Sequence, residues 1–117
     1  MIVRGGVPLI EARGVTRILP GIVPTTLVQG IDLAILENEF VAITGPSGSG
    51  KSSLLYLVGL LDLPTTGEVL IRGRETTHMD EEERAVTRLT LLGFVFQFHF
   101  LLPEFTVLDN VMLPMRA

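Results

Sequence analysis

Alternating apolar and polar positions predict strands at the start and in the middle of the chain. Leu9–Ala12 and Ile31–Leu36 alternate apolar with polar side chains, which is typical of strands buried on one face. The prolines and glycine of Pro20–Pro24 predict a loop between them. Gly67–Arg72 returns to strand character and is followed by Gly73. We expect an antiparallel β portion in the N-terminal part of the fold.

Two other segments, Phe40–Thr44 and Leu92–Phe96, are apolar without alternation. Such runs are typical of strands buried on both faces of a mainly parallel sheet. Together with the helices described next, they predict a mixed α/β domain. Two strands of this kind are few for a self-sufficient parallel sheet, so we expect an incomplete domain.

The longest apolar stretch predicts a buried helix. With the polar residues Lys51–Ser53 before it, the predicted helix covers Lys51–Leu61 and is halted by Pro64, because proline removes a backbone donor and clashes with the preceding turn. Asp62 then reads as a solvated end of this helix.

Two polar signals predict further helices. Asp80–Arg84 begins with acidic residues, which favour a helix N-terminus. Thr106 is a good cap for a short helix that Pro114 would end. No internal repeat or linker interrupts the chain, so residues 1–117 are expected to be part of one domain.

Composition narrows the class of protein. The chain has 117 residues, of which 47% are hydrophobic and 19% charged, a profile far from that of disordered chains. Its net charge of -4 and its 9 scattered basic residues speak against a nucleic-acid partner. Without cysteine, it has no disulfide, thiolate nucleophile or Cys-based zinc site. The start Met1–Gly6 does not resemble an export signal, and the longest apolar run, Leu54–Leu61, is too short to span a membrane.

One motif carries chemistry. Residues Gly45–Ser52 fit the pattern G-x-x-x-x-G-K-[ST], between a predicted strand and a predicted helix. Glycines let the loop wrap tightly, so that backbone N–H groups and the helix N-terminus surround a phosphate. The alternative is a surface turn without function. However, a chain of this length would match the pattern by chance in only about one of a few hundred cases. The predicted phosphate ligands are Gly45, Pro46, Ser47, Gly48, Ser49, Gly50, Lys51, Ser52 and Ser53.

Within this loop, two side chains have distinct roles. Lys51 would place its positive charge on the β- and γ-phosphates of ATP, as a catalytic residue. Ser52 would offer its hydroxyl oxygen to Mg²⁺, which prefers oxygen ligands. ATP and Mg²⁺ are therefore the expected ligands.

The chain resembles the ATP-binding cassette (ABC) proteins in two places. One is the loop Gly45–Ser52, and the other is the stretch Phe94–Val111, which is similar to the segment around the family's Q-loop glutamine. Within the family, Gln97–Thr106 is most similar to ATP-binding subunits of bacterial lipoprotein-releasing systems. Macrolide-exporter and cell-division relatives share a looser form. The resemblance spans residues 8 to 115 and corresponds to the first half of a cassette domain.

The resemblance implies a P-loop NTPase fold and an ATPase that drives lipoprotein release or export from the inner membrane. Gln97 would reach the Mg²⁺ ion and the attacking water, as a catalytic residue and metal ligand. The segment Phe98–Phe105 would touch integral-membrane permease subunits. A second copy of the subunit would complete the working form. The implied location is peripheral, on the cytoplasmic face of a bacterial inner membrane.

Departures from the family pattern matter too. Leu19 stands where the family usually has an aromatic residue that stacks on adenine. The signature Leu-Ser-Gly-Gly-Gln, the apolar strand ending in Asp-Glu (Walker B) and the switch histidine are absent, so we expect ATP binding without turnover. His78 and His99 have no partners at ligand spacing and are assigned no role. The alternatives are a short, non-hydrolysing docking module or another P-loop protein, although a GTPase would need an Asn-Lys-x-Asp motif that is missing.

Overall fold

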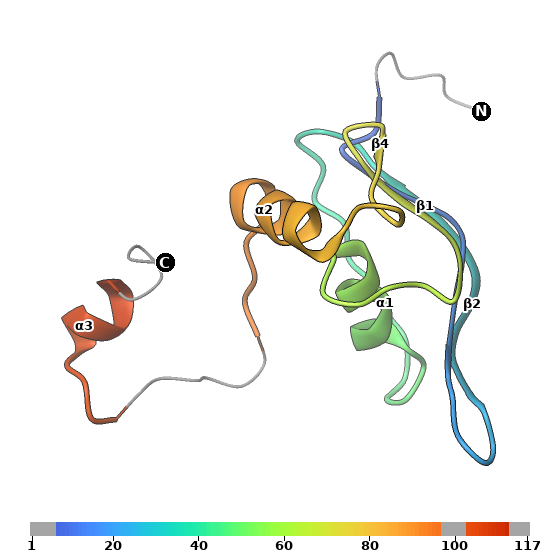
Figure 1. Cartoon of the computed structure of the whole chain (residues 1–117), viewed down its shortest axis with the longest axis horizontal. Coiled ribbons are helices and arrows are strands. Elements are labelled where there is room, and N and C mark those ends of the chain that lie inside the picture. Colours follow the sequence, from blue (N-terminus) through green and yellow to red (C-terminus); the bar gives the residue numbers. More distant parts are fainter. Residues whose placement is uncertain (1–6, 97–102, 113–117) are drawn as a thin grey trace.

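The structure is a computed structural model that describes residues 7–96 and 103–112. One sheet and one short helix form its centre, and two further helices follow (Figure 1). The elements in chain order are β1 (Ile10–Leu19), β2 (Thr25–Ile35), α1 (Lys51–Val58), β3 (Thr66–Ile71), β4 (Arg74–Glu75), α2 (Glu81–Leu91) and α3 (Val107–Met112).

The sheet is antiparallel throughout and has the strand order β2-β1-β3-β4. β1 pairs with β2 on one side and with β3 on the other, with Ile10 opposite both Ile35 and Ile71. This confirms the expected antiparallel portion. The loop Pro20–Pro24 joins β1 to β2, as predicted.

β1 and β2 are longer than the alternation indicated. The pairing of β1 with β2 shifts between Ala12 and Val15, at an irregularity that contains Gly14 with a φ of 55°. Ala12 and Val15 are both buried although they are three positions apart. A bulge adds a residue to one strand and moves the alternation out of phase, so the strand continues where its pattern is broken.

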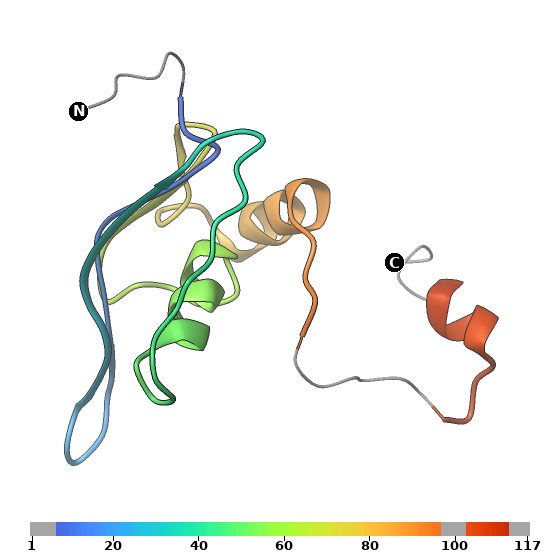
Figure 2. The same cartoon turned by 180° about the vertical axis from the view of Figure 1, so that it is seen from behind.

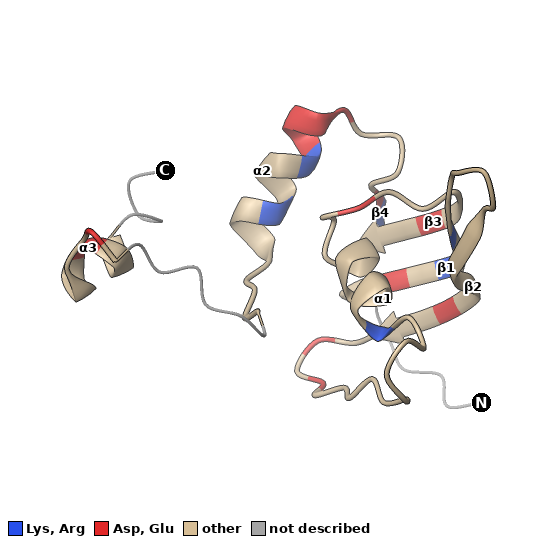
Figure 3. Cartoon of the chain, turned by 90° about the horizontal axis from the view of Figure 1, so that it is seen from below, with Lys and Arg blue, Asp and Glu red and all other residues tan. Residues whose placement is uncertain are grey.

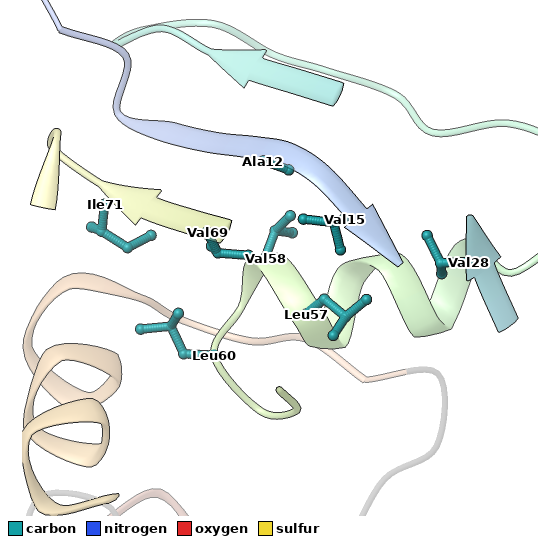
Figure 4. Packing of buried hydrophobic residues seen from close by; sticks show 8 residues of the cluster. All are labelled: Ala12, Val15, Val28, Leu57, Val58, Leu60, Val69 and Ile71. Atoms are coloured by element: carbon teal, nitrogen blue, oxygen red, sulfur yellow. The ribbon is translucent and has the colours of Figure 1, made fainter. Parts of the chain in front are cut away.

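The core lies between this sheet and α1 (Figure 4). Leu57 and Val58 from α1 face Val15 and Val69 from the strands, and all four are nearly or fully inaccessible to solvent. The remaining members of the cluster are Ala12, Val28, Leu60 and Ile71. Burial of such side chains is the main favourable term in folding, so α1 is held on the sheet by its C-terminal half.

α1 ends at Val58, earlier than predicted, and the prediction of a helix as far as Leu61 is wrong. Leu60 adopts a left-handed backbone conformation, with a φ of 63°. Its carbonyl oxygen accepts hydrogen bonds from Arg84 (3.0 Å) and Arg88 (2.6 Å) of α2. Asp62 is not a free helix end, because its carboxylate pairs with Arg17 of β1 at 2.8 Å. These contacts turn the chain away from the helix before proline is reached.

The two segments predicted as doubly buried strands are not strands. Phe40–Thr44 and Leu92–Phe96 have no regular structure, and Phe40 and Val95 are fully exposed. A run of apolar residues becomes a strand only where neighbouring strands accept and donate its backbone hydrogen bonds. Within residues 7–96 and 103–112, every strand pair is antiparallel and none includes these segments.

The two remaining helices begin as predicted. Asp80 caps α2 by accepting a hydrogen bond from the N–H of Glu83 (2.8 Å), and the acidic first turn is visible in Figure 3. Thr106 caps α3 by accepting from the N–H of Asp109 (3.1 Å). Figures 1 and 2 both show α3 apart from the sheet, and it has no buried residue. Pro114, predicted to end it, lies outside the described residues.

Candidate functional site

The glycine-rich loop leads directly into α1 and rests against the start of β2. Its last glycine, Gly50, has a φ of 93°, a left-handed conformation that glycine adopts without strain. A side chain at this position would overlap the carbonyl oxygen of Leu27 in β2. Glycine is therefore required here both by the backbone angle and by the close approach of the strand.

Within the loop, a tight turn is closed by a hydrogen bond from the N–H of Ser49 to the carbonyl of Pro46 (3.2 Å). Gly48, inside this turn, has a φ of 82°. A side chain at Gly45 would come within 2.7 Å of the hydroxyl of Ser49. The loop thus folds back on itself, as a phosphate-wrapping loop must.

A cleft of about 490 Å³ opens between the loop, the start of α1 and the start of β2. Its lining consists of small and hydroxylated side chains with one leucine and one lysine. The lining residues are Thr25, Thr26, Leu27, Ser47, Gly48, Gly50, Lys51, Ser52 and Ser53.

The first turn of α1 supplies backbone donors to this cleft. The carbonyl of Gly50 accepts the first helical hydrogen bond, from the N–H of Leu54 (2.9 Å). The N–H groups that precede Leu54 in the helix have no acceptor within it. The three residues that carry them, Lys51–Ser53, all line the cleft. Unpaired amides and the positive end of the helix dipole favour an anion at this place.

Lys51 is the only lysine in the chain, and among the described residues it is the only charged one that lines the cleft. Its ammonium donates a hydrogen bond to the carbonyl of Gly45, at the opposite end of the loop. An ammonium has three donors, so this bond leaves capacity for a ligand. The contact closes the loop and keeps the charge beside its backbone amides.

The structure brings most of the predicted phosphate ligands to one cleft. Gly45, Pro46 and Ser49 are not in the lining, although they form the rest of the loop. Gln97 lies outside the described residues, as do Phe98–Leu102 of the predicted permease contact. Phe105, at the end of that contact, is half exposed. The binding roles of all these residues stay predictions.

Sequence reasoning missed the wall formed by β2. Thr25, Thr26 and Leu27 face the loop across the cleft, about twenty positions before it in the chain. The signal that could have found them is the hairpin, because a loop over Pro20–Pro24 pairs Leu19 with Thr25. Leu19, the residue paired with Thr25, is the position at which the family usually has an aromatic residue.

A metal ion would have few protein ligands here. No group of three or more His, Cys, Asp or Glu side chains suited to a metal occurs in the described part of the chain. The hydroxyl of Ser52, in the cleft lining, fits the Mg²⁺ preference for oxygen. Mg²⁺ commonly keeps several waters and is held by one or two protein groups plus phosphate oxygens, so the residues present fit such an ion.

None of the helices within residues 7–96 and 103–112 has the length and apolar character needed to cross a bilayer.

Comparison of the chain with known proteins identifies its family and its fold. The family model described as "ABC transporter" matches residues 28–117. The lipoprotein-releasing system ATP-binding protein LolD of Anaeromyxobacter dehalogenans is 51% identical over 111 residues, which is 94% of this chain and 46% of that protein. LolD of Aquifex aeolicus is 46% identical over 107 residues, which is 92% of this chain and 46% of that protein. The chain thus spans about half the length of these curated relatives.

Among solved structures, the ATP-binding cassette MJ0796, in a dimeric post-hydrolysis state bound to ADP and Pi, is 42% identical to this chain. The match has a TM-score of 0.85 and covers 92% of this chain and 47% of the MJ0796 chain. The expected ABC ATPase fold is therefore confirmed. With the family model covering most of its length and relatives near 50% identity, the chain belongs to the ABC transporter family.

Proposed function

We propose that residues 1–117 form the nucleotide-binding part of an ABC transporter ATPase subunit. This part binds Mg-ATP through the loop Gly45–Ser52. The observation that carries this proposal is the convergence of one ammonium, one hydroxyl and the first amides of α1 on a single cleft. The state of MJ0796 bound to ADP and Pi supports it, because that protein has the same fold.

The chain's own residues contribute binding and charge neutralisation. The amides of Gly48–Ser53 would surround the phosphates, and Lys51 would pair with the β- and γ-phosphates. Mg²⁺, held by Ser52 and the phosphates, would neutralise charge that develops as the terminal phosphoryl group leaves. Gln97 is proposed as the residue that orients the attacking water.

Turnover by the chain alone is not expected. Its sequence contains no Leu-Ser-Gly-Gly-Gln signature and no apolar strand followed by Asp-Glu. In the proposed working form, a second copy of the subunit and membrane permease subunits complete the assembly, with Phe98–Phe105 at the permease contact. The similarity to LolD proteins supports lipoprotein release at the inner membrane as the transport step.

Isothermal titration calorimetry with Mg-ATP tests the binding proposal. Loss of a hydrogen bond to a charged partner typically costs about 1.5–3 kcal/mol, so Lys51→Ala should weaken binding about 10- to 150-fold. Arg13→Ala, an exposed cation in β1, is the matched control and should bind as the parent chain does. Equal affinities for the parent and Lys51→Ala would contradict the proposal.

The metal role of Ser52 has a separate readout. In the parent chain, ATP should bind more tightly with Mg²⁺ than with EDTA, because the ion links the hydroxyl to the phosphates. Ser52→Ala should lose most of this difference while keeping the affinity measured in EDTA. A magnesium effect that survives unchanged in Ser52→Ala would show that the ion is held elsewhere.

A further inference from the structure

The turn that follows α1 is held by side chains of α2. Arg84 donates one hydrogen bond to the carbonyl of Leu60 (3.0 Å) and another to the carbonyl of Asp62 (3.1 Å). Arg88, one helical turn further along α2, donates to the same carbonyl of Leu60 at 2.6 Å. Hydrogen bonds from a charged donor are stronger than those between neutral groups. Two guanidinium groups therefore converge on one oxygen just beyond the end of α1.

α1 connects this turn to the phosphate site. A helix of eight residues is about 12 Å long, so Leu60 and the cleft lie at opposite ends of one short element. The first-turn residues Lys51–Ser53 are exposed or half-buried, whereas the buried residues of the helix, Leu57 and Val58, belong to its last turn. Contacts at the C-terminal end of α1 therefore largely set the direction in which its first amides point.

The charges at the two ends of α1 act in the same sense. The helix dipole is negative at the C-terminal end, where the two guanidinium groups lie, and positive at the end that faces the cleft. A phosphate at the cleft and a cation at the turn therefore stabilise the same orientation of α1. The pairing of Arg88 with Glu81 contributes less, because it is long (3.8 Å) and the side chain of Glu81 is 74% exposed.

We propose that Arg88 is a positioning residue for the phosphate site. Arg88 is not part of the cleft lining. It acts through the carbonyl of Leu60, which fixes the end of α1 and with it the direction of the amides of Lys51–Ser53. The inference rests on the proposed function, since it requires phosphate at those amides. It adds a side chain from outside the loop to the residues on which Mg-ATP affinity depends.

Arg88 is the arginine that can be replaced with the least disturbance. Its side chain is 24% exposed, against 6% for Arg84. Its aliphatic stem borders the same hollow as Leu61 and Leu92. An unbranched apolar side chain fits there, and Arg84 still donates to the carbonyl of Leu60 when Arg88 is replaced.

Calorimetric titration with Mg-ATP compares Arg88→Met with Arg88→Lys. The two new side chains are similar in length, but only lysine can donate to the carbonyl of Leu60. Arg88→Met should bind Mg-ATP about 2- to 30-fold more weakly than the parent chain, the range expected when a coupling between separate sites is lost. Arg88→Lys should recover most of the affinity. Equal affinities for Arg88→Met and the parent chain, or no recovery with lysine, would overturn the inference.

Asp32→Ala is the control for a general loss of stability. The carboxylate of Asp32 accepts a hydrogen bond from the N–H of Gly14 (2.8 Å), and Asp32 is exposed and lies outside the cleft lining. This variant should unfold at a lower urea concentration and still bind Mg-ATP as the parent chain does. A loss of affinity in Asp32→Ala that matches the loss in Arg88→Met would show that stability alone is responsible, and would also overturn the inference.

Amide hydrogen exchange in the parent chain gives a measurement that needs no variant. Coupling between two sites is reciprocal, so phosphate binding should stabilise the turn as the turn stabilises the phosphate site. Saturating Mg-ATP should slow exchange in the loop and also at the N–H groups of Leu60, Leu61 and Asp62, which donate to the carbonyls of Leu57 and Tyr56. Slowing in the loop alone would overturn the inference and leave the proposed function intact. If Mg-ATP slows exchange in neither place, the proposed function itself fails.

Discussion

Two glycines of the loop share an unusual backbone conformation but differ in their surroundings. Gly48 and Gly50 have φ values of 82° and 93°. A side chain at Gly48 would meet nothing within 4 Å, whereas one at Gly50 would overlap the backbone of β2 at Leu27. The two positions therefore separate the cost of backbone strain from the cost of losing a close approach.

We expect Gly48→Ala to lower the free energy of unfolding by about 1 kcal/mol, the cost of a left-handed conformation for an L-residue. Gly50→Ala should cost clearly more, because the loop must also move away from β2, and should weaken Mg-ATP binding more strongly. Urea unfolding and calorimetry on both variants measure the two effects. Equal losses of stability would show that the contact with Leu27 is unimportant.

At this scale, the sequence predicted the loop well because its residues are contiguous and each has a chemical role. Thr25 and Thr26 could not be recognised in the same way, since a threonine in a strand has no signature of its own. They reach the cleft only through the hairpin and the close packing of Gly50. Asp62 was misread for a related reason, because its partner Arg17 lies 45 positions away.

Among the elements, α2 shows how the sequence fixes a helix start. Asp80 accepts the N–H of Glu83, and Glu81 pairs with Arg84 at 3.1 Å. The side chain of Arg84 is 6% exposed and also donates to the carbonyls of Leu60 and Asp62. The cap therefore sets where the helix begins, and Arg84 connects it to the turn after α1.

Asp80→Ala should lower the free energy of unfolding by about 1 kcal/mol, because it removes a cap from an N–H of the first turn. Glu82→Ala, in the same turn but without a role in the cap, should change stability by less than about 0.5 kcal/mol. Urea unfolding followed by circular dichroism measures both. Similar losses in the two variants would indicate that acidic charge near the helix start, rather than the cap, is what matters.

Elements with local signals were predicted, and elements that depend on distant partners were not. The starts of α2 and α3, the hairpin loop, the alternation in parts of β1 and β2 and the strand character of β3 can all be recognised within a few residues. Phe40–Thr44 and Leu92–Phe96 have the composition of buried strands, but composition does not supply a neighbouring strand. The chain turns just after α1, where the carbonyl of Leu60 accepts hydrogen bonds from Arg84 and Arg88 of α2. The end of α1 could therefore not be predicted from the neighbouring residues alone.

At the scale of the whole molecule, many large apolar side chains are exposed to solvent. The radius of gyration is 16.3 Å, against about 13 Å expected for a compact domain of this length. Phe40 and Val95 are fully exposed, and Phe94 and Phe96 stack on each other with their centroids 5.8 Å apart while remaining partly exposed. Apolar surface of this extent favours association.

We expect the chain to self-associate as its concentration rises, with stronger association in higher salt. Replacing both Phe40 and Val95 by Ser should shift the equilibrium toward monomer without loss of folded structure, because both side chains are exposed. Thr90→Ser, on the exposed face of α2, is the control and should leave association unchanged. Sedimentation velocity over a concentration series measures it, and a chain that remains monomeric throughout would contradict the prediction.

The position of the single lysine allows ligand binding to be measured through the reactivity of one side chain. Apart from the terminal α-amine, Lys51 carries the only primary amine in the chain, and this residue lines the cleft. An acylating reagent followed by peptide mass spectrometry would therefore report protection of one nitrogen, with the α-amine as an internal standard in the same sample. Ligands could then be ranked by how far they slow this one reaction, without a fluorophore or radiolabel attached to any of them.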